Sequence, residues 1–396
     1  MSPSNLYDLS PLLSLLLLGA SLATVPVGWV WLRHRGAGVP RRRLALTVLT
    51  LFLTFDLILV GAFTRLTDSG LGCPDWPGCY GKASPLQAVE SIQQAQDAMP
   101  SGPVTHQKAW IEMLHRYLAT TVGALTVVMT WLAWKDRRSA LTRTAAQAWP
   151  SAWWPTWTLV WICLQGAFGA LTVTMKLFPA IVSLHLLGAY GLLALLVIQA
   201  VLWTRSVQGP APVSGPGGVP GASLSVAALA AGLVLLAVQA SSGAWVSTNY
   251  AVLACTEFPM CQGQWWPAMD FAAAAEIWRP LGEHADGSTI SFQALTAIHV
   301  THRLLAMLTL AVLATLAWRM RRVPALQQPA RALAALLVLQ LLTGLSNVVL
   351  GWPLLAAILH TGGAGALVAV LVWALARIWP APAQAAAGAT PAGVRP

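Results

Sequence analysis

Long apolar runs alternate with short polar stretches along almost the whole chain. Each run is about 20 residues or longer, which is enough for a helix to cross a hydrocarbon core of about 30 Å. The pattern predicts transmembrane helices at roughly 11–32, 44–64, 108–134, 153–175, 178–203, 223–247, 291–318, 331–351 and 353–379. The predicted fold class is therefore an all-α polytopic membrane protein.

The composition and the charge pattern agree with this class. Hydrophobic residues make up 57% of the chain and charged residues 9%, against about 25% charged in a soluble domain. The net charge of +10 does not indicate nucleic-acid binding, because most of the basic residues lie in alternate short loops between spans. This bias predicts a bacterial-type cell-membrane protein with its N-terminus outside and its C-terminus cytoplasmic. The first span lacks a basic residue ahead of it, so we expect an uncleaved anchor.

Two parts of the sequence share the same landmarks in the same order. In each part a glycine precedes a cysteine by twelve residues, a His-Arg dipeptide follows, and a glutamine later precedes a histidine by twenty. These residues are Gly61, Cys73, Gln165 and His185 in the first part, and Gly243, Cys255, Gln340 and His360 in the second. We interpret them as two tandem four-helix bundles related by an internal repeat.

This repeat divides the chain into five parts. They are an extra N-terminal transmembrane helix with a basic loop (1–43), a first four-helix unit (44–205), a flexible cytoplasmic linker rich in Gly and Pro (206–222), a second four-helix unit (223–380) and a disordered tail (381–396).

Four histidines lie at one depth in the predicted bundles. His115, His185, His302 and His360 each lie about 10–16 Å below the outer end of a span, on the second and fourth helix of each unit. Facing imidazoles inside a bundle are the arrangement that ligates haem iron. A lone membrane histidine is more commonly a hydrogen-bonded interior residue, and zinc would require cysteine or carboxylate ligands converging on one point. Four histidines in matching positions favour haem ligation over both of these alternatives.

Charged residues accompany these candidate ligands. Arg116 and Arg303 each follow a candidate ligand, and a guanidinium suits a haem propionate, although an arginine can also snorkel to the membrane interface. Arg65 is a third candidate for a propionate contact. Glu112 lies one helical turn from His115. We expect it to take part in chemistry, with a structural partnership to Arg116 or Arg65 as the alternative.

The five cysteines include two pairs of identical spacing in predicted outer loops. An oxidising exterior favours the disulfides Cys73–Cys79 and Cys255–Cys261 over metal binding, and leaves open whether they are structural or redox-active. Cys163 is alone within an apolar run, so we expect a small buried hydrophobe.

Together these residues give the chain a resemblance to the haem A synthase family, over about residues 44–379. The most specific segments are Arg65–Leu71 with Asp75-Trp76-Pro77, then Glu112–Arg116, His185, His302-Arg303 and His360. Two features depart from the family pattern. The first span lies outside the eight-helix core, and His299 beside His302 offers a second candidate ligand. We prefer His302, because it aligns with His115 and precedes an arginine.

The resemblance implies an oxidoreductase that converts the C8 methyl group of haem O to a formyl group by successive hydroxylations, giving haem A for terminal oxidases. It implies that His115 and His185 ligate the substrate haem O, that His302 and His360 ligate the iron of haem B, and that Glu112 is required for activity. The expected partners are haem O, the haem O synthase that supplies it, an unidentified electron acceptor and the lipid bilayer, with no nucleic acid. A homo-oligomer is left open.

Two other functions remain to be weighed against this one. A dihaem cytochrome b-type electron carrier accounts for the four histidines but not for Glu112 or for the differences between the two units. A haem transporter would need a site open to both faces of the membrane, whereas the four histidines lie toward one face.

Overall fold

The computed structural model describes residues 10–140, 150–208 and 226–378 of the chain. Within these ranges nine helices are long and apolar enough to cross a membrane. They are α1 (Ser10–Arg33), α2 (Val39–Leu66), α4 (His106–Ala140), α5 (Trp153–Thr174), α6 (Pro179–Gln208), α7 (Val226–Thr248), α9 (Phe292–Met320), α10 (Gln327–Val349) and α11 (Leu354–Ile378). They overlap every predicted span, so the prediction of an all-α polytopic membrane protein is confirmed.

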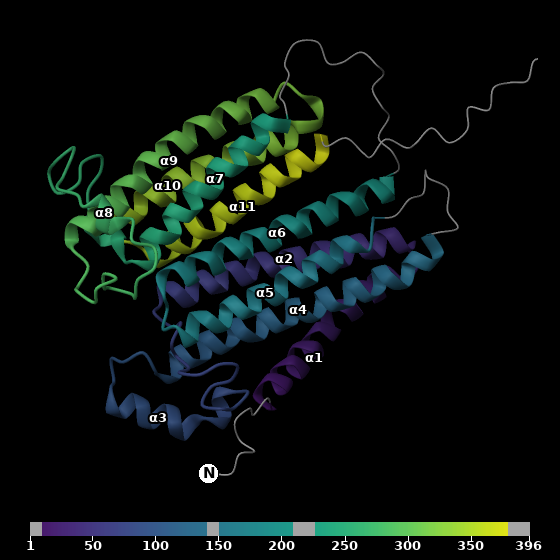
Figure 1. Ribbon diagram of the computed structural model, residues 1–396. Coiled ribbons are helices and arrows are strands. Elements are labelled where there is room, and N and C mark those ends of the chain that lie inside the picture. The colour runs from purple at the N-terminus through teal and green to yellow at the C-terminus, as the bar shows by residue number, and fades with distance from the viewer. Residues whose placement is uncertain (1–9, 141–149, 209–225, 379–396) are drawn as a thin grey trace, which may run out of the picture.

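Eight of these helices form two bundles that lie side by side (Figure 1). In the first bundle α4 and α6 occupy opposite corners, and each packs on both α2 and α5. In the second bundle α9 and α11 occupy opposite corners, and each packs on both α7 and α10. The helices that carry the candidate ligands are therefore diagonal in each bundle, with the bundle centre between them. We keep the internal repeat as an interpretation, which this packing supports.

The two bundles meet along α2, α6, α7 and α11. Their shared core includes Leu193 from the first bundle and Leu229 and Leu371 from the second. The Tyr190 hydroxyl on α6 donates to the Thr361 carbonyl oxygen on α11 over 2.8 Å. A buried hydroxyl must find such a partner in a membrane interior, where no water is present to satisfy it.

The extra helix α1 packs along the outer side of the first bundle, chiefly against α4 (Figure 1). A methyl group on Gly19 would lie 2.7 Å from Cβ of Thr120, so the absence of a side chain lets the two helices approach closely. Leu15 and Ala23 extend this contact toward the two ends of α4, where they belong to separate buried clusters. The helix is thus an integral wall of the first bundle.

Two long loops, 67–105 and 249–291, lie at the same end of the bundles, which we call the disulfide end. They contain the helices α3 (Val89–Ala98) and α8 (Phe271–Ala274) and the 3₁₀ turns η2 (Pro85–Gln87) and η4 (Ala251–Ala254), while η5 (Pro324–Leu326) precedes α10. The sequence did not predict α3, because it is short and polar and buries only Ile92.

The first three residues of the predicted linker 206–222 continue α6, which ends at Gln208. The rest of this predicted linker, 209–222, and the predicted tail 381–396 lie outside the described residues. The helix extends further than expected because backbone hydrogen bonding continues beyond the apolar segment that the sequence pattern detects.

Both predicted disulfides are present, at the disulfide end. Cys73 bonds Cys79 and Cys255 bonds Cys261, with a Cα–Cα distance of 4.9 Å in each pair. All four cysteines are buried. Cys163 is exposed on α5, so the expectation of burial is wrong. An apolar residue in a membrane helix can face lipid as readily as protein, and one position carries no periodicity that would tell the two apart.

We expect thiol labelling of the unfolded, unreduced protein to modify Cys163 alone, because the other cysteines are in disulfides. Labelling after reduction should modify all five cysteines. Peptide mass spectrometry would assign each modified site. Labelling of Cys73 or Cys255 without reductant would show that its disulfide does not persist.

Candidate functional site

One cavity of about 1350 Å³ runs through both bundles. Its lining is mostly apolar and includes the four predicted ligands, His115, His185, His302 and His360. The structure therefore brings together the residues that the sequence singled out. It also shows what the sequence missed, since Ala20 and Thr24 of the extra helix α1 line the same cavity.

Each of the four imidazoles lies against a glycine of the neighbouring helix. A methyl group on the glycine would lie 3.0–3.1 Å from Cε1 of the ring in three of the pairs, which would crowd the ring, and 3.4 Å from it in the pair of Gly169 with His185, which is ordinary contact. The pairs are Gly61 with His115, Gly169 with His185, Gly243 with His302, and Gly344 with His360. These glycines, each on a helix next to a histidine helix, allow the rings to turn toward the bundle centre.

The side chains suit a haem better than a bare metal ion. Among the described residues, no group of three or more His, Cys, Asp and Glu side chains is close enough to hold a metal. A haem supplies four nitrogen ligands itself and needs only one imidazole on each side of its plane. Diagonal helices that each present one imidazole into an apolar cavity fit that requirement.

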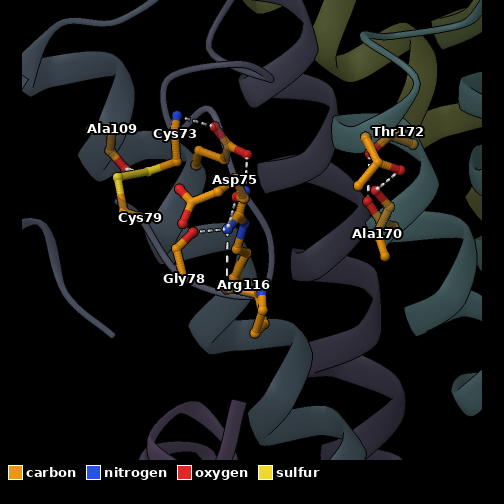
Figure 2. A network of polar contacts seen from close by, with 12 residues as sticks. Cys73, Asp75, Gly78, Cys79, Ala109, Arg116, Ala170 and Thr172 are labelled. Carbon is orange, nitrogen blue, oxygen red and sulfur yellow. Dashed lines mark hydrogen bonds and ion pairs between the residues drawn. A yellow bond between two sulfur atoms is a disulfide. The ribbon is translucent and has the colours of Figure 1, made fainter. Parts of the chain in front are cut away.

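Glu112 and Arg116 form an ion pair beneath the first disulfide loop. One Glu112 oxygen accepts from the Cys73 backbone N–H over 2.8 Å, and the other accepts from Nη2 of Arg116. Figure 2 shows Arg116 pointing into this loop, where Nη1 donates to the carbonyl oxygens of Asp75, Pro77 and Gly78. The pair therefore ties α4 to the loop, which is the structural partnership named as the alternative for Glu112.

The second bundle has a similar arrangement without the carboxylate. Arg303 donates through Nη1 to the Met260 carbonyl oxygen and through Nη2 to the Cys255 carbonyl oxygen, each over 3.1 Å. Its buried Nε has no hydrogen-bond partner among the described residues. His299 takes the place of Glu112; it is 3% exposed, and both His299 and Arg303 border the cavity.

Arg65 joins the two bundles at the disulfide end. Its Nη2 donates to the Ser247 carbonyl oxygen over 2.7 Å and its Nη1 to the Tyr250 hydroxyl over 3.0 Å. Its guanidinium also lies over the Tyr250 ring, and Asp68 accepts hydrogen bonds from both Arg65 and Tyr250. This contact was not predictable from the sequence, because the partners are about 180 residues apart. Contact of Arg65, Arg116 and Arg303 with haem propionates stays a prediction.

Arg279 is a further arginine of the disulfide end, and the sequence pattern did not mark it as important. Arg279 is fully buried, and its Nη2 donates to Oδ1 of Asn249 over 2.6 Å. It also donates to the carbonyl oxygens of Glu276 and Glu283 and lies over the Trp245 ring. Burial lowers the pKa of this guanidinium. Arg279 therefore organises the second loop from within.

Comparison with known proteins gives a consistent result. A family model described as cytochrome oxidase assembly protein matches residues 44–372. The haem A synthase of Shewanella oneidensis is 38% identical over 337 residues, which cover 82% of this chain and 93% of that protein. The haem A synthase of Halalkalibacterium halodurans is 26% identical, over 77% of this chain and 86% of that protein. The haem A synthase of Rhizorhabdus wittichii is 27% identical, over 83% of this chain and 91% of that protein. The family match begins after α1.

The contacts of Arg116 lead to a prediction for the first disulfide loop. Arg116→Lys keeps the positive charge but cannot reach the three carbonyl oxygens and Glu112 together. A loss of about 1.4 kcal/mol in loop stability would speed reduction of Cys73–Cys79 by roughly tenfold. Differential alkylation with mass spectrometry measures each disulfide separately. Arg303→Lys is the matched control and should affect Cys255–Cys261 instead. Equal reduction rates of Cys73–Cys79 in Arg116→Lys and the unmodified protein would contradict this role.

Proposed function

This chain belongs to the haem A synthase family, and on that premise we propose that one bundle binds the substrate haem and the other a cofactor haem. The first bundle binds the substrate haem O between His115 and His185. The second bundle binds haem B between His302 and His360. The observation that carries this proposal is the diagonal pair of imidazoles in each bundle, each turned by a glycine toward a shared apolar cavity.

The chemistry of the proposal is an oxidation. The C8 methyl group of haem O is hydroxylated twice, with water as the candidate oxygen source, and each hydroxylation passes two electrons to an acceptor still to be identified. The resulting geminal diol loses water to leave the formyl group. The protein's part is to hold the substrate in an apolar cavity and to place a charged group near the reacting edge. A haem O synthase is the expected supplier of this substrate.

Glu112 is the candidate for that charged group. It is 4% exposed, borders the cavity and lies one turn from His115 on α4. Cys73 and Arg116 each occupy one of its oxygens, and a carboxylate oxygen can accept a second bond. The ion pair therefore fixes the carboxylate while leaving capacity to take a proton or to stabilise developing positive charge.

The orientation in the membrane follows from the charge bias of the loops. We place the disulfide end outside, because most basic residues lie in loops at the opposite end. Two disulfides at one end suit an oxidising exterior. In this orientation the N-terminus is outside and the C-terminus cytoplasmic.

We expect His302→Ala and His360→Ala each to lower the haem B content of the purified protein, because each removes one axial ligand. His299→Ala is the matched control on the same helix and should retain most of its haem B. Pyridine haemochrome analysis measures the content. Full haem B content in both ligand variants would contradict the assignment, and loss in His299→Ala as complete as in His302→Ala would identify His299 as the ligand.

We expect Glu112→Gln to stop conversion of haem O while both bundles retain haem. Glutamine keeps the shape and can still accept from Cys73, but it carries no negative charge and does not take up a proton at neutral pH. A rate loss of roughly 10²-fold or more would match the removal of one catalytic group. The measurement is haem analysis of cells that supply haem O.

The yield and visible spectrum of the purified variant separate the catalytic role from the structural one. If Glu112 has only a structural role, the Glu112→Gln variant leaves Arg116 without its carboxylate partner. That variant should then show low yield and poor haem retention in the first bundle. Normal haem A production by Glu112→Gln would rule out the catalytic role.

A further inference from the structure

The two bundles differ at the second nitrogen of each histidine ring. Iron is bound through one ring nitrogen, and the hydrogen bond made by the other fixes the orientation and protonation of the ring. In the second bundle Nδ1 of both histidines has a hydroxyl partner. In the first bundle neither Nδ1 of His115 nor Nδ1 of His185 has a hydroxyl partner among the described residues.

The hydroxyl partners come from α7 and α10. Oγ of Ser242 lies 2.9 Å from Nδ1 of His302, and Oγ1 of Thr343 lies 3.0 Å from Nδ1 of His360. Ser242 directly precedes Gly243, and Thr343 directly precedes Gly344, the two glycines against which these rings lie. In each of the two helices, a glycine therefore makes room for the histidine ring and the residue before it provides the hydroxyl contact to Nδ1.

The direction of these hydrogen bonds is set by the helix backbone. The Ser242 hydroxyl donates its proton to the Gln239 carbonyl oxygen over 2.8 Å, and the Thr343 hydroxyl donates to the Leu339 carbonyl oxygen over 2.8 Å. With its proton on the backbone carbonyl, each hydroxyl oxygen accepts from the histidine. This arrangement assigns the ring proton to Nδ1 and leaves the Nε2 lone pair for iron.

Gln239 adds a second contact in the same place. Its amide nitrogen lies 3.1 Å from Nδ1 of His302, while its amide oxygen is buried without a hydrogen-bond partner in the described part of the chain. A half-turn of the terminal amide exchanges the two atoms and places the oxygen on Nδ1–H. Only the turned amide agrees with a proton on Nδ1, and it also gives the amide oxygen the partner that it otherwise lacks.

The first bundle has apolar residues at the corresponding places. Val60 precedes Gly61, which lies against His115, and Phe168 precedes Gly169, which lies against His185. Neither side chain can accept a hydrogen bond. The Gln165 backbone is a hydrogen-bond partner of His185 as the Gln340 backbone is of His360, so this contact does not distinguish the bundles, and what His185 lacks is a hydroxyl partner. The difference rests on the residue before each glycine.

We infer that Ser242 and Thr343 are positioning residues that retain haem B in the second bundle, whereas Val60 and Phe168 leave the first bundle able to exchange its haem. This inference rests on the proposed function, which requires a permanent cofactor in one bundle and a substrate that arrives and a product that leaves in the other. A hydrogen-bonded imidazole is oriented before binding and is a more basic ligand. Loss of such an outer contact typically lowers metal affinity by about 10–100-fold.

The test follows haem release from the purified full-length protein. With haem B loaded into both bundles, transfer to excess apomyoglobin should occur in a fast phase from the first bundle and a slow phase from the second. Ser242→Ala and Thr343→Val should each speed the slow phase by about tenfold or more. The controls are Ser241→Ala and Thr315→Val, whose hydroxyls donate to the Ala237 and Ala311 carbonyl oxygens, and these should leave both phases unchanged.

Two further variants separate the hydrogen bond from a general loss of stability. Ser242→Thr restores a hydroxyl and should restore slow release. Val60→Ser introduces one in the first bundle and should slow the fast phase. The midpoint potential of haem B should rise in Ser242→Ala, because a less basic imidazole stabilises the oxidised iron less. A slow phase and a potential unchanged in both Ser242→Ala and Thr343→Val would overturn the inference.

This outcome is distinguishable from failure of the proposed function. If the unmodified protein converts haem O but Ser242→Ala and Thr343→Val release haem B at the unmodified rate, the function stands and the inference fails. If the unmodified protein releases both haems in one slow phase and makes no haem A, the division between the bundles fails as well.

Discussion

The structure is organised around four imidazoles that are buried at membrane depth. A polar group in the hydrocarbon region is costly unless the protein or a ligand satisfies it. Each ring is placed on a diagonal helix and turned inward against a glycine. The cavity between the diagonals is therefore a consequence of where these rings lie, and the other helices of each bundle enclose it.

Loop residues of the disulfide end, among them Trp76 and Phe258, line part of the cavity. Arg116 lies on α4 and Arg303 on α9, and each donates hydrogen bonds to backbone carbonyl oxygens of a disulfide loop. Arg65 then fixes one bundle to the other through Ser247 and Tyr250. Arginines at these positions serve the fold as well as any bound propionate, because a guanidinium has five donors and can contact several acceptors at once.

The sequence predicted the membrane helices, the four histidines and both disulfides, because each leaves a periodic or repeated mark. It could not predict the partner of Arg65 or the place of α1 in the cavity wall, since both depend on packing between distant segments. The Nδ1 partners were also missed. In the sequence, Ser242 and Thr343 look like ordinary polar residues of a membrane helix. Only the structure shows that their hydroxyls lie against histidine rings, at the positions that Val60 and Phe168 occupy in the first bundle.

The most direct test of the central claim is the pigment content of the unmodified protein. The protein would be purified from cells that supply haem O, and its haems extracted and separated by chromatography. We predict haem B together with haem O or haem A, in about equal amounts, because one bundle holds a cofactor and the other a substrate or product. Haem B alone, at two per chain, would contradict the division of labour and identify a dihaem electron carrier.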